Sequence, residues 1–279
     1  KLIDDAFAST FITEGMVTCL DCAFMQEIAE YPLMLISLIL WHFRLCGDQD
    51  YLAQNYPKIC RLLDVYRADY EKDFLLRDLD KWCVVEWPAN FRDGYDVDIT
   101  EGRVCHTPHV AINAYYLEAI HCANQIAALL GQSAYRDEAP LRARFTAAFY
   151  DETRHIFRDS TETRHASFIG NALAYGFRLY PDETCAETIE AWTDRVGITA
   201  VGLFGVWPLL CGLVRRGKRE RVLSLIGEDG AWKRMLREGA TSTFEGWGKD
   251  TKWNTSLFHL TMTDAAVFLA DIDLEALFG

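Results

Sequence analysis

The chain has 279 residues, of which 50% are hydrophobic, and its formal net charge is -13. This length and composition predict one large folded domain over residues 1–279 with a substantial core. Because the negative charge repels polyanions, it argues against nucleic acid and anionic membrane surfaces as partners and favours a neutral or cationic ligand.

Apolar residues recur at helical spacing through most of the chain. The first clear pair of helices covers residues 32–46, which begin with Pro32 and stop before Gly47, and residues 51–70. The same pattern predicts helices over residues 110–130, 135–150, 166–179, 186–196, 204–216, 220–226 and 252–269, and a short one that ends at Gly239. Helices at hairpin spacing predict an all-α domain, and an (α/α)6-type toroid of helical hairpins repeats such pairs.

Two segments interrupt the helical pattern. Residues 74–108 show no period, and their Trp, Phe and Tyr residues argue against disorder, so we expect a functional loop. Residues 155–158 alternate in polarity and predict a small β-hairpin. The aromatic content of 13% suits carbohydrate binding, although packed helices also use such residues as core.

The nine cysteines are an odd number and are scattered, several of them within apolar helical segments. They are typical of free thiols in a reducing compartment, so we expect a cytoplasmic protein. Cys19 and Cys22 form a CxxC pair, but no second pair lies at zinc-ribbon spacing, and no motif predicts a metal ion or a cofactor. The chain opens without a signal-peptide pattern, and the most apolar run, residues 33–43, is too short to cross a bilayer.

One carboxylate stands out on the small-residue loop that follows Gly239. Glu245 lies between Phe244 and Trp247, and aromatic walls can raise the pKa of a carboxyl group and offer a face to a sugar ring. A lone acid on such a loop is nevertheless more often a solvated or capping residue than a catalyst.

The residues of this loop carry a family resemblance. The segment Gly-Ala-Thr-Ser-Thr-Phe-Glu-Gly-Trp at 239–247 resembles the Gly-Ala-Thr-Thr-x-x-Glu-x-Trp loop of the bacterial α-L-rhamnosidase family, which are inverting six-hairpin glycoside hydrolases. Residues 256–259 resemble the Ser-x-Asn-His of that family, with Phe258 in place of the Asn, and residues 201–210 resemble its Thr-Gly-Phe-x-Gly-x-x-x-Leu-Leu stretch. Weaker similarity begins at Glu14 and continues through the chain.

The resemblance implies a function and a set of site residues. It implies hydrolysis of terminal α-L-rhamnosyl residues of a carbohydrate substrate, with Glu245 as general base and His259 in contact with the sugar. The loop at 86–95 resembles a sugar-facing loop of some members, which implies substrate binding by Glu86, Trp87, Arg92, Asp93 and Tyr95. Trp247 is the further loop aromatic that we expect to stack on a sugar.

The general acid is harder to place. The acid segment of the family, Asp-x-x-Arg-x-Glu-x-x-Gly-Trp, does not occur in this sequence, nor do the β-sandwich domains of the family. Either the chain is a fragment, or the acid is replaced, or the toroid is incomplete at its N-terminus and inactive. The candidates for an acid on the long loop are Glu86, Asp93 and Asp96.

Two rival functions follow. One is a carbohydrate-binding toroid without turnover, which the missing acid segment favours. The other is a toroidal glycosidase or phosphorylase that acts on a different sugar. The residues indicate neither the exact sugar and linkage nor the oligomeric state.

Overall fold

The computed structural model describes residues 1–9, 12–13, 16–18, 26–100 and 102–270. The chain divides into a first unit, made of residues 1–84, 97–150 and 159–164, and a second unit, made of residues 85–96, 151–158 and 165 onward. The CxxC pair at Cys19 and the start of the upstream resemblance at Glu14 lie outside the described residues.

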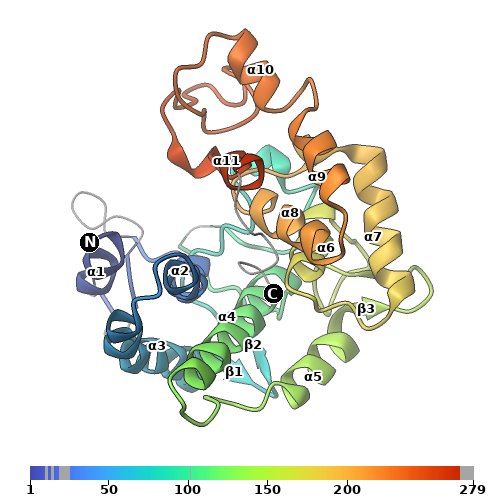
Figure 1. Cartoon of the computed structure of the whole chain (residues 1–279). Coiled ribbons are helices and arrows are strands. Elements are labelled where there is room, and N and C mark those ends of the chain that lie inside the picture. The colour runs from blue at the N-terminus through green and yellow to red at the C-terminus, as the bar shows by residue number, and fades with distance from the viewer. Residues whose placement is uncertain (10–11, 14–15, 19–25, 101, 271–279) are drawn as a thin grey trace. The chain divides into compact units, whose positions relative to one another are not determined.

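The first unit is built around α4, whose residues 110–120 are all buried. Ala111, Ala114, Ala119 and Ala123 of this helix are each 0% exposed. Helix α4 packs against α2, α3 and α5 (Figure 1). The elements of this unit are α1 (Leu2–Ala8), α2 (Glu30–Cys46), α3 (Gln49–Asp69), β1 (Glu71–Lys72), β2 (Leu75–Leu76), α4 (Val110–Leu129) and α5 (Ala139–Phe149).

The second unit is organised by the crossing of α6 and α8, with α7 beside α6 and α9 beside α8 (Figure 1). A Cβ atom added to Gly176 would lie 2.4 Å from the backbone oxygen of Pro208, so only glycine permits this approach. The helices of this unit are α6 (Phe168–Gly176), α7 (Glu183–Val196), α8 (Val206–Arg215), α9 (Arg219–Ile226), α10 (Trp232–Arg237) and α11 (Ala265–Leu269), with the short 3-10 turns η1 (Ala89–Phe91), η2 (Ile198–Ala200) and η3 (Leu260–Met262).

Each unit ties a short strand to the helix that follows it through a buried asparagine. In the first unit, Asn113 on α4 accepts from the Leu76 amide at 2.7 Å and donates to the Leu76 carbonyl at 3.2 Å. In the second unit, Asn171 on α6 does the same at 2.8 and 2.9 Å with Phe157, which lies on β4 (Ile156–Phe157) after β3 (Tyr150–Asp151). Each asparagine also donates to the carbonyl four residues before it. One side chain therefore satisfies both backbone groups of a strand edge.

Most predicted helices are confirmed within a few residues of their expected ends, and the hairpin predicted at 155–158 corresponds to β3 and β4. The helix predicted over residues 252–269 is wrong, because its first half is a loop that leads to η3 and α11. In this loop the Thr255 hydroxyl bonds to the backbone of Lys252, which competes with helix formation. Trp253, which lies in this loop, is 95% exposed.

Among the described cysteines, Cys46, Cys60, Cys83, Cys105, Cys122, Cys185 and Cys211 are free thiols. Across the described part of the chain, no helix has both the length and the apolar character needed to cross a membrane.

Candidate active site

The loop that carries Glu245 is paired with the segment that carries His259. The Glu245 amide donates to the Ser256 carbonyl at 2.9 Å, and the His259 amide donates to the Thr243 carbonyl at 2.8 Å. The Thr243 hydroxyl donates to the His259 carbonyl at 2.6 Å. These bonds bring two separate motifs of the sequence resemblance side by side within the second unit.

Three donors hold the carboxylate of Glu245, whose side chain is 11% exposed. Its Oε1 accepts from the Trp87 indole N–H at 2.7 Å and lies 2.9 Å from Nζ of Lys252. Its Oε2 accepts from the Ser256 amide at 2.9 Å. The carboxylate is therefore mostly buried, and it is bonded to two neutral donors and one cationic donor of the protein.

The pKa of Glu245 shifts in the direction opposite to the one that its aromatic neighbours in the sequence suggest. Burial alone would raise its pKa, as the flanking aromatics led us to expect. The Ser256 amide, the Trp87 indole and the Lys252 ammonium outweigh burial and hold the pKa of Glu245 below its ordinary value. Glu245 is consequently ionised at neutral pH, which is the state a proton acceptor requires.

The aromatic neighbours of Glu245 in the sequence are mostly buried. Phe244 is 2% exposed and Trp247 is 3% exposed. The Trp247 indole donates to the Val201 carbonyl at 2.7 Å and lies edge-on to Trp232, with ring centres 4.8 Å apart. Trp247 thus packs the loop that carries Glu245 onto the 201–205 loop, and its predicted stacking on a sugar stays a prediction.

Glu86 lies at the centre of the second loop of the site. Glu86 is 0% exposed. Its two carboxyl oxygens accept four hydrogen bonds of 2.8–2.9 Å from backbone N–H groups. Oε1 accepts from Trp87 and Phe204, and Oε2 accepts from Gly202 and Gly205. Burial raises the pKa of Glu86 to about 7, against the lowering effect of these four amides. The carboxyl joins the 85–96 loop to the 201–205 loop, and a sugar contact would require it to leave these donors.

Two glycines make room for this junction. A Cβ atom on Gly202 would lie 2.4 Å from the Trp87 carbonyl oxygen, and a Cβ atom on Gly205 would lie 2.8 Å from Oε2 of Glu86. The third motif of the resemblance, residues 201–210, therefore supplies amides that only glycine can bring so close.

The other predicted residues of the long loop have structural contacts. Arg92 donates to the Glu86 carbonyl at 3.1 Å, and Oδ2 of Asp93 accepts from the Phe168 amide at 2.7 Å. Tyr95 is buried, whereas Asp96 is exposed. None of these contacts tests a role in substrate binding, so those roles stay predictions.

His259 and Trp87 lie nearer to Glu245. Burial lowers the pKa of His259, the negative charge of Glu245 raises it, and the positive charge of Lys252 lowers it. Trp87 is half-buried and faces the Lys252 ammonium, 5.2 Å from its ring centre. Sequence reasoning missed Lys252, since one lysine at the start of a predicted helix gives no signal.

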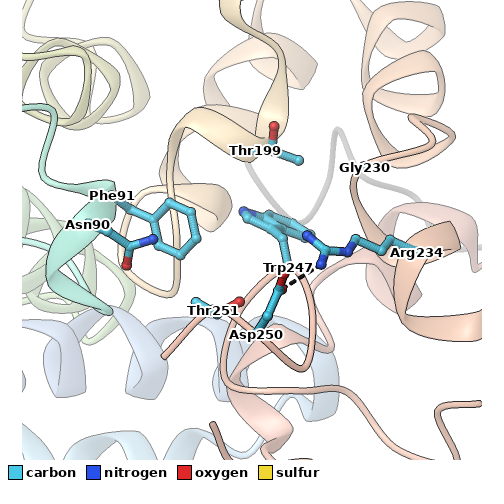
Figure 2. Close-up of a pocket in the computed structure, with 8 residues that line it drawn as sticks. All are labelled: Asn90, Phe91, Thr199, Gly230, Arg234, Trp247, Asp250 and Thr251. Atoms are coloured by element: carbon cyan, nitrogen blue, oxygen red, sulfur yellow. Dashed lines mark hydrogen bonds and ion pairs between the residues drawn. The ribbon is translucent and has the colours of Figure 1, made fainter. Parts of the chain in front are cut away.

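A pocket of about 330 Å³ is lined in part by the Trp247 ring (Figure 2). Figure 2 shows the Arg234 and Asp250 ion pair on one side of Trp247 and Phe91 on the other. The lining residues are Asn90, Phe91, Thr199, Gly230, Arg234, Trp247, Asp250 and Thr251.

Comparison with protein families gives one match over most of the sequence. Residues 22–272 match the bacterial alpha-L-rhamnosidase 6 hairpin glycosidase domain. The chain belongs to this family. Its glycoside hydrolase fold is therefore the all-α, six-hairpin fold that the sequence predicted. No curated protein sequence matches the chain.

Solved structures of rhamnosidases share this fold. The GH78 rhamnosidase of Bacillus sp. GL1 has a TM-score of 0.74 and 17% identity over 95% of this chain and 28% of its own. The Streptomyces avermitilis α-L-rhamnosidase complexed with L-rhamnose has a TM-score of 0.69 and 18% identity over 95% of this chain and 26% of its own. The Klebsiella oxytoca rhamnosidase with rhamnose bound has a TM-score of 0.67 and 14% identity over 90% and 50%. The chain thus spans half or less of the length of these proteins.

Proposed function

We propose that this member of the six-hairpin rhamnosidase family acts in the hydrolysis of terminal α-L-rhamnosyl residues with inversion, and that Glu245 is the general base. The observation that carries the proposal is the ionised, recessed carboxylate of Glu245 on the loop that resembles the base loop of the family. Family membership and the bound rhamnose of two similar proteins support the choice of sugar.

The chemistry assigns Glu245 one proton transfer. An inverting enzyme places a water molecule between the base and the anomeric carbon, opposite the leaving group, with the two carboxyl groups about 6.5–9.5 Å apart. As the water oxygen bonds to the anomeric carbon, Glu245 takes a proton from it and the glycosidic C–O bond breaks. The departing oxygen takes its proton from a general acid, and the sugar is released with inverted configuration.

The three predicted acids differ in how their carboxyl groups are held. Glu86 is buried among four N–H donors, which suit a carboxylate rather than a group that gives up a proton to a substrate. Asp93 and Asp96 are exposed, and Asp93 accepts one backbone N–H bond. Loss of a true acid slows substrates with poor leaving groups far more than activated aryl rhamnosides, so each can be tested singly.

The sugar contacts are part of the same proposal. We propose that Trp87 and His259 contact a sugar bound at Glu245. Trp87 is half-buried and donates to Glu245, and the charge of Glu245 raises the pKa of His259, which supports this proposal. We extend the proposal to Arg92 and Tyr95 on the resemblance alone, and to Trp247 as an aromatic residue on the same loop as Glu245.

The test is release of free rhamnose from an aryl α-L-rhamnoside. We expect Glu245→Gln to lower kcat by about 10²–10⁴-fold, the usual contribution of a positioned acid or base, while the exposed Glu220→Gln of α9 retains full rate. Proton NMR of the first product should show the inverted anomer. Full activity in Glu245→Gln would remove it as the base.

Other outcomes of the same assay separate the rival functions. Binding of rhamnose by calorimetry with no turnover would make the chain a carbohydrate-binding domain. Turnover that requires inorganic phosphate would make it a phosphorylase, and activity on other aryl glycosides alone would reassign the sugar.

The compartment is also a proposal. The free thiols of the described cysteines favour a reducing environment such as the cytoplasm. A labelled antibody in cell fractions tests this directly.

A further inference from the structure

Lys252 makes the closest charged contact to the proposed base. Its Nζ lies 2.9 Å from Oε1 of Glu245 and 5.2 Å from the centre of the Trp87 ring. The Lys252 side chain is 20% exposed and the Glu245 side chain is 11% exposed, so solvent screens the pair only in part. The ammonium is therefore shared between a carboxylate oxygen and an indole face, a more restrictive setting than a surface ion pair.

The backbone holds Lys252 in place from both ends of a tight turn. The Lys252 amide donates to the Thr255 hydroxyl at 2.8 Å, and that hydroxyl and the Thr255 amide donate to the Lys252 carbonyl at 2.8 and 3.2 Å. The next residue, Ser256, exchanges two bonds of 2.9 Å with Glu245, one through the backbone and one through Oε2. The turn thus connects the ammonium directly to the segment that binds the carboxylate.

The two oxygens of Glu245 are filled unequally. Oε1 accepts from Trp87 and from Lys252, whereas Oε2 accepts from the Ser256 amide. A carboxylate oxygen has two lone-pair sites, so the described contacts fill Oε1 and leave one acceptor site on Oε2. A proton that Glu245 accepts is therefore expected to bind to Oε2.

We propose that Lys252 is a positioning residue, which holds Oε1 beside the Trp87 indole so that Oε2 faces the water whose proton Glu245 removes. The inference rests on the proposed role of Glu245 as general base. It assigns the proton of the attacking water to one named atom, and it gives the loop of residues 252–255 a function that neither family membership nor the sequence supplies.

A neighbouring ion pair shows what a merely structural contact looks like. Arg234 bonds to Asp250, two residues before Lys252, but these side chains are 36% and 75% exposed. Such exposed pairs contribute little to stability. Lys249 is an exposed lysine on the same loop, so Lys249→Met serves as the matched control for Lys252→Met.

The groups that face Glu245 also determine how the test is read. Trp87 and Ser256 are neutral, and His259 is the other titratable side chain whose charge interacts with that of Glu245. Because the positive charge of Lys252 also lowers the pKa of His259, its removal changes both groups. The measurement should therefore be repeated in a His259→Gln background.

The experiment observes the base through its own hydrogen bond. The indole N–H of Trp87 donates to Oε1, so its nitrogen-15 NMR signal follows the protonation of Glu245. Trp87→Phe identifies this signal among those of the eight tryptophans, and Glu245→Gln should abolish its titration. We expect Lys252→Met to raise the titration midpoint by about 1–2 pH units, the effect of losing an adjacent cation. Lys252→Arg and Lys249→Met should leave the midpoint near that of the wild type.

An unchanged midpoint in Lys252→Met would overturn the proposal, as would a wild-type Trp87 signal that does not follow Glu245. If the methionine variant does not fold, Lys252→Gln removes the charge but keeps a polar group, and its midpoint must still rise. In the rhamnoside assay, Lys252→Met should lower kcat with little change in KM and move the acid limb of the pH profile upward. A chain that hydrolyses no rhamnoside would refute the proposed function, while the NMR titration would still decide whether Lys252 controls Glu245.

Discussion

At the scale of single residues, the two glutamates of the site are held by different kinds of donor. Glu245 is bonded to a cation and two neutral groups and its pKa is lowered, whereas Glu86 is bonded to four backbone amides and burial raises its pKa to about 7. The first arrangement leaves acceptor capacity on one oxygen, and the second uses all of it. Glu86 therefore acts on the site through the loops that it connects.

A conservative change at Glu86 tests this structural role. In Glu86→Gln an NH2 group replaces one carboxyl oxygen. Two backbone N–H groups then face a donor and lose their acceptor. We expect a loss of roughly 2–3 kcal/mol in the free energy of unfolding, the cost of unsatisfied buried groups, measured by urea denaturation. The exposed Glu187→Gln of α7 is the control and should change stability little. Equal stability of the two variants would show that these amides find other partners.

The residues of the site could be predicted only where a motif or an unusual environment marked them. Glu245 was found because a family pattern covers its loop. Lys252 gave no such signal, since its importance comes from a distance of 2.9 Å to Oε1 and not from its neighbours in the sequence. Burial was equally invisible in the sequence: Glu86 is 0% exposed and Trp247 is 3% exposed, and their predicted sugar contacts stay predictions.

At the scale of elements, a repeated connection joins a β-hairpin to the helix that follows it. Asn113 performs it in the first unit and Asn171 in the second, each with bonds to both backbone groups of one strand residue. The flanking sequences agree in outline, with Leu-Leu-Arg-Asp at 75–78 and Ile-Phe-Arg-Asp at 156–159. A search for identical repeats misses this similarity, because the hydrogen-bond pattern recurs while the sequence between the hairpin and the helix differs.

Removal of one asparagine should destabilise the protein strongly. Asn171→Ala leaves the buried amide and carbonyl of Phe157 without their partner, so we expect a loss of roughly 2–4 kcal/mol in the free energy of unfolding. Asn113→Ala should behave alike, and the exposed Asn254→Ala should have little effect. Urea denaturation followed by circular dichroism measures all three. A loss below about 0.5 kcal/mol in both buried variants would mean that water replaces the side chain.

Helical spacing predicted the longer helices well because their buried faces repeat regularly. It failed between residues 252 and 260, where apolar side chains are not a sign of burial. Trp253 and Phe258 are 95% and 72% exposed, so their spacing reports nothing about a core face. The side chain of Thr255 turns the backbone instead, and tertiary pairing with Glu245 fixes the loop.

At the scale of the whole molecule, one buried titratable group in each unit makes the stability depend on pH, and the two dependences have opposite signs. His109 of the first unit is 0% exposed, and burial lowers its pKa to about 3. Oδ2 of Asp264 in the second unit is buried, and burial, aided by the charge of Glu86, raises its pKa to about 7. Both groups are thus favoured in their uncharged forms in the folded chain.

The consequences for stability have opposite signs over one pH range. The contribution of His109 is fully present above the unfolded pKa of 6.5 and is lost as the pH falls toward 3. The contribution of Asp264 is fully present below the unfolded pKa of 3.8 and is lost as the pH rises toward 7. Between about pH 4 and pH 7 the two changes therefore offset each other in the wild type.

Single variants should expose each contribution. Between pH 4 and pH 7, the stability of Asp264→Asn relative to the wild type should rise by on the order of 2 kcal/mol, and that of His109→Gln should fall by a similar amount. Guanidinium unfolding at a series of pH values measures both differences. Asp229→Asn, whose side chain is 84% exposed, is the control for removal of an exposed carboxylate. Stability differences that do not vary with pH would mean that neither buried group changes its protonation on unfolding. The pH dependence of the stability of the protein would then have to come from other groups.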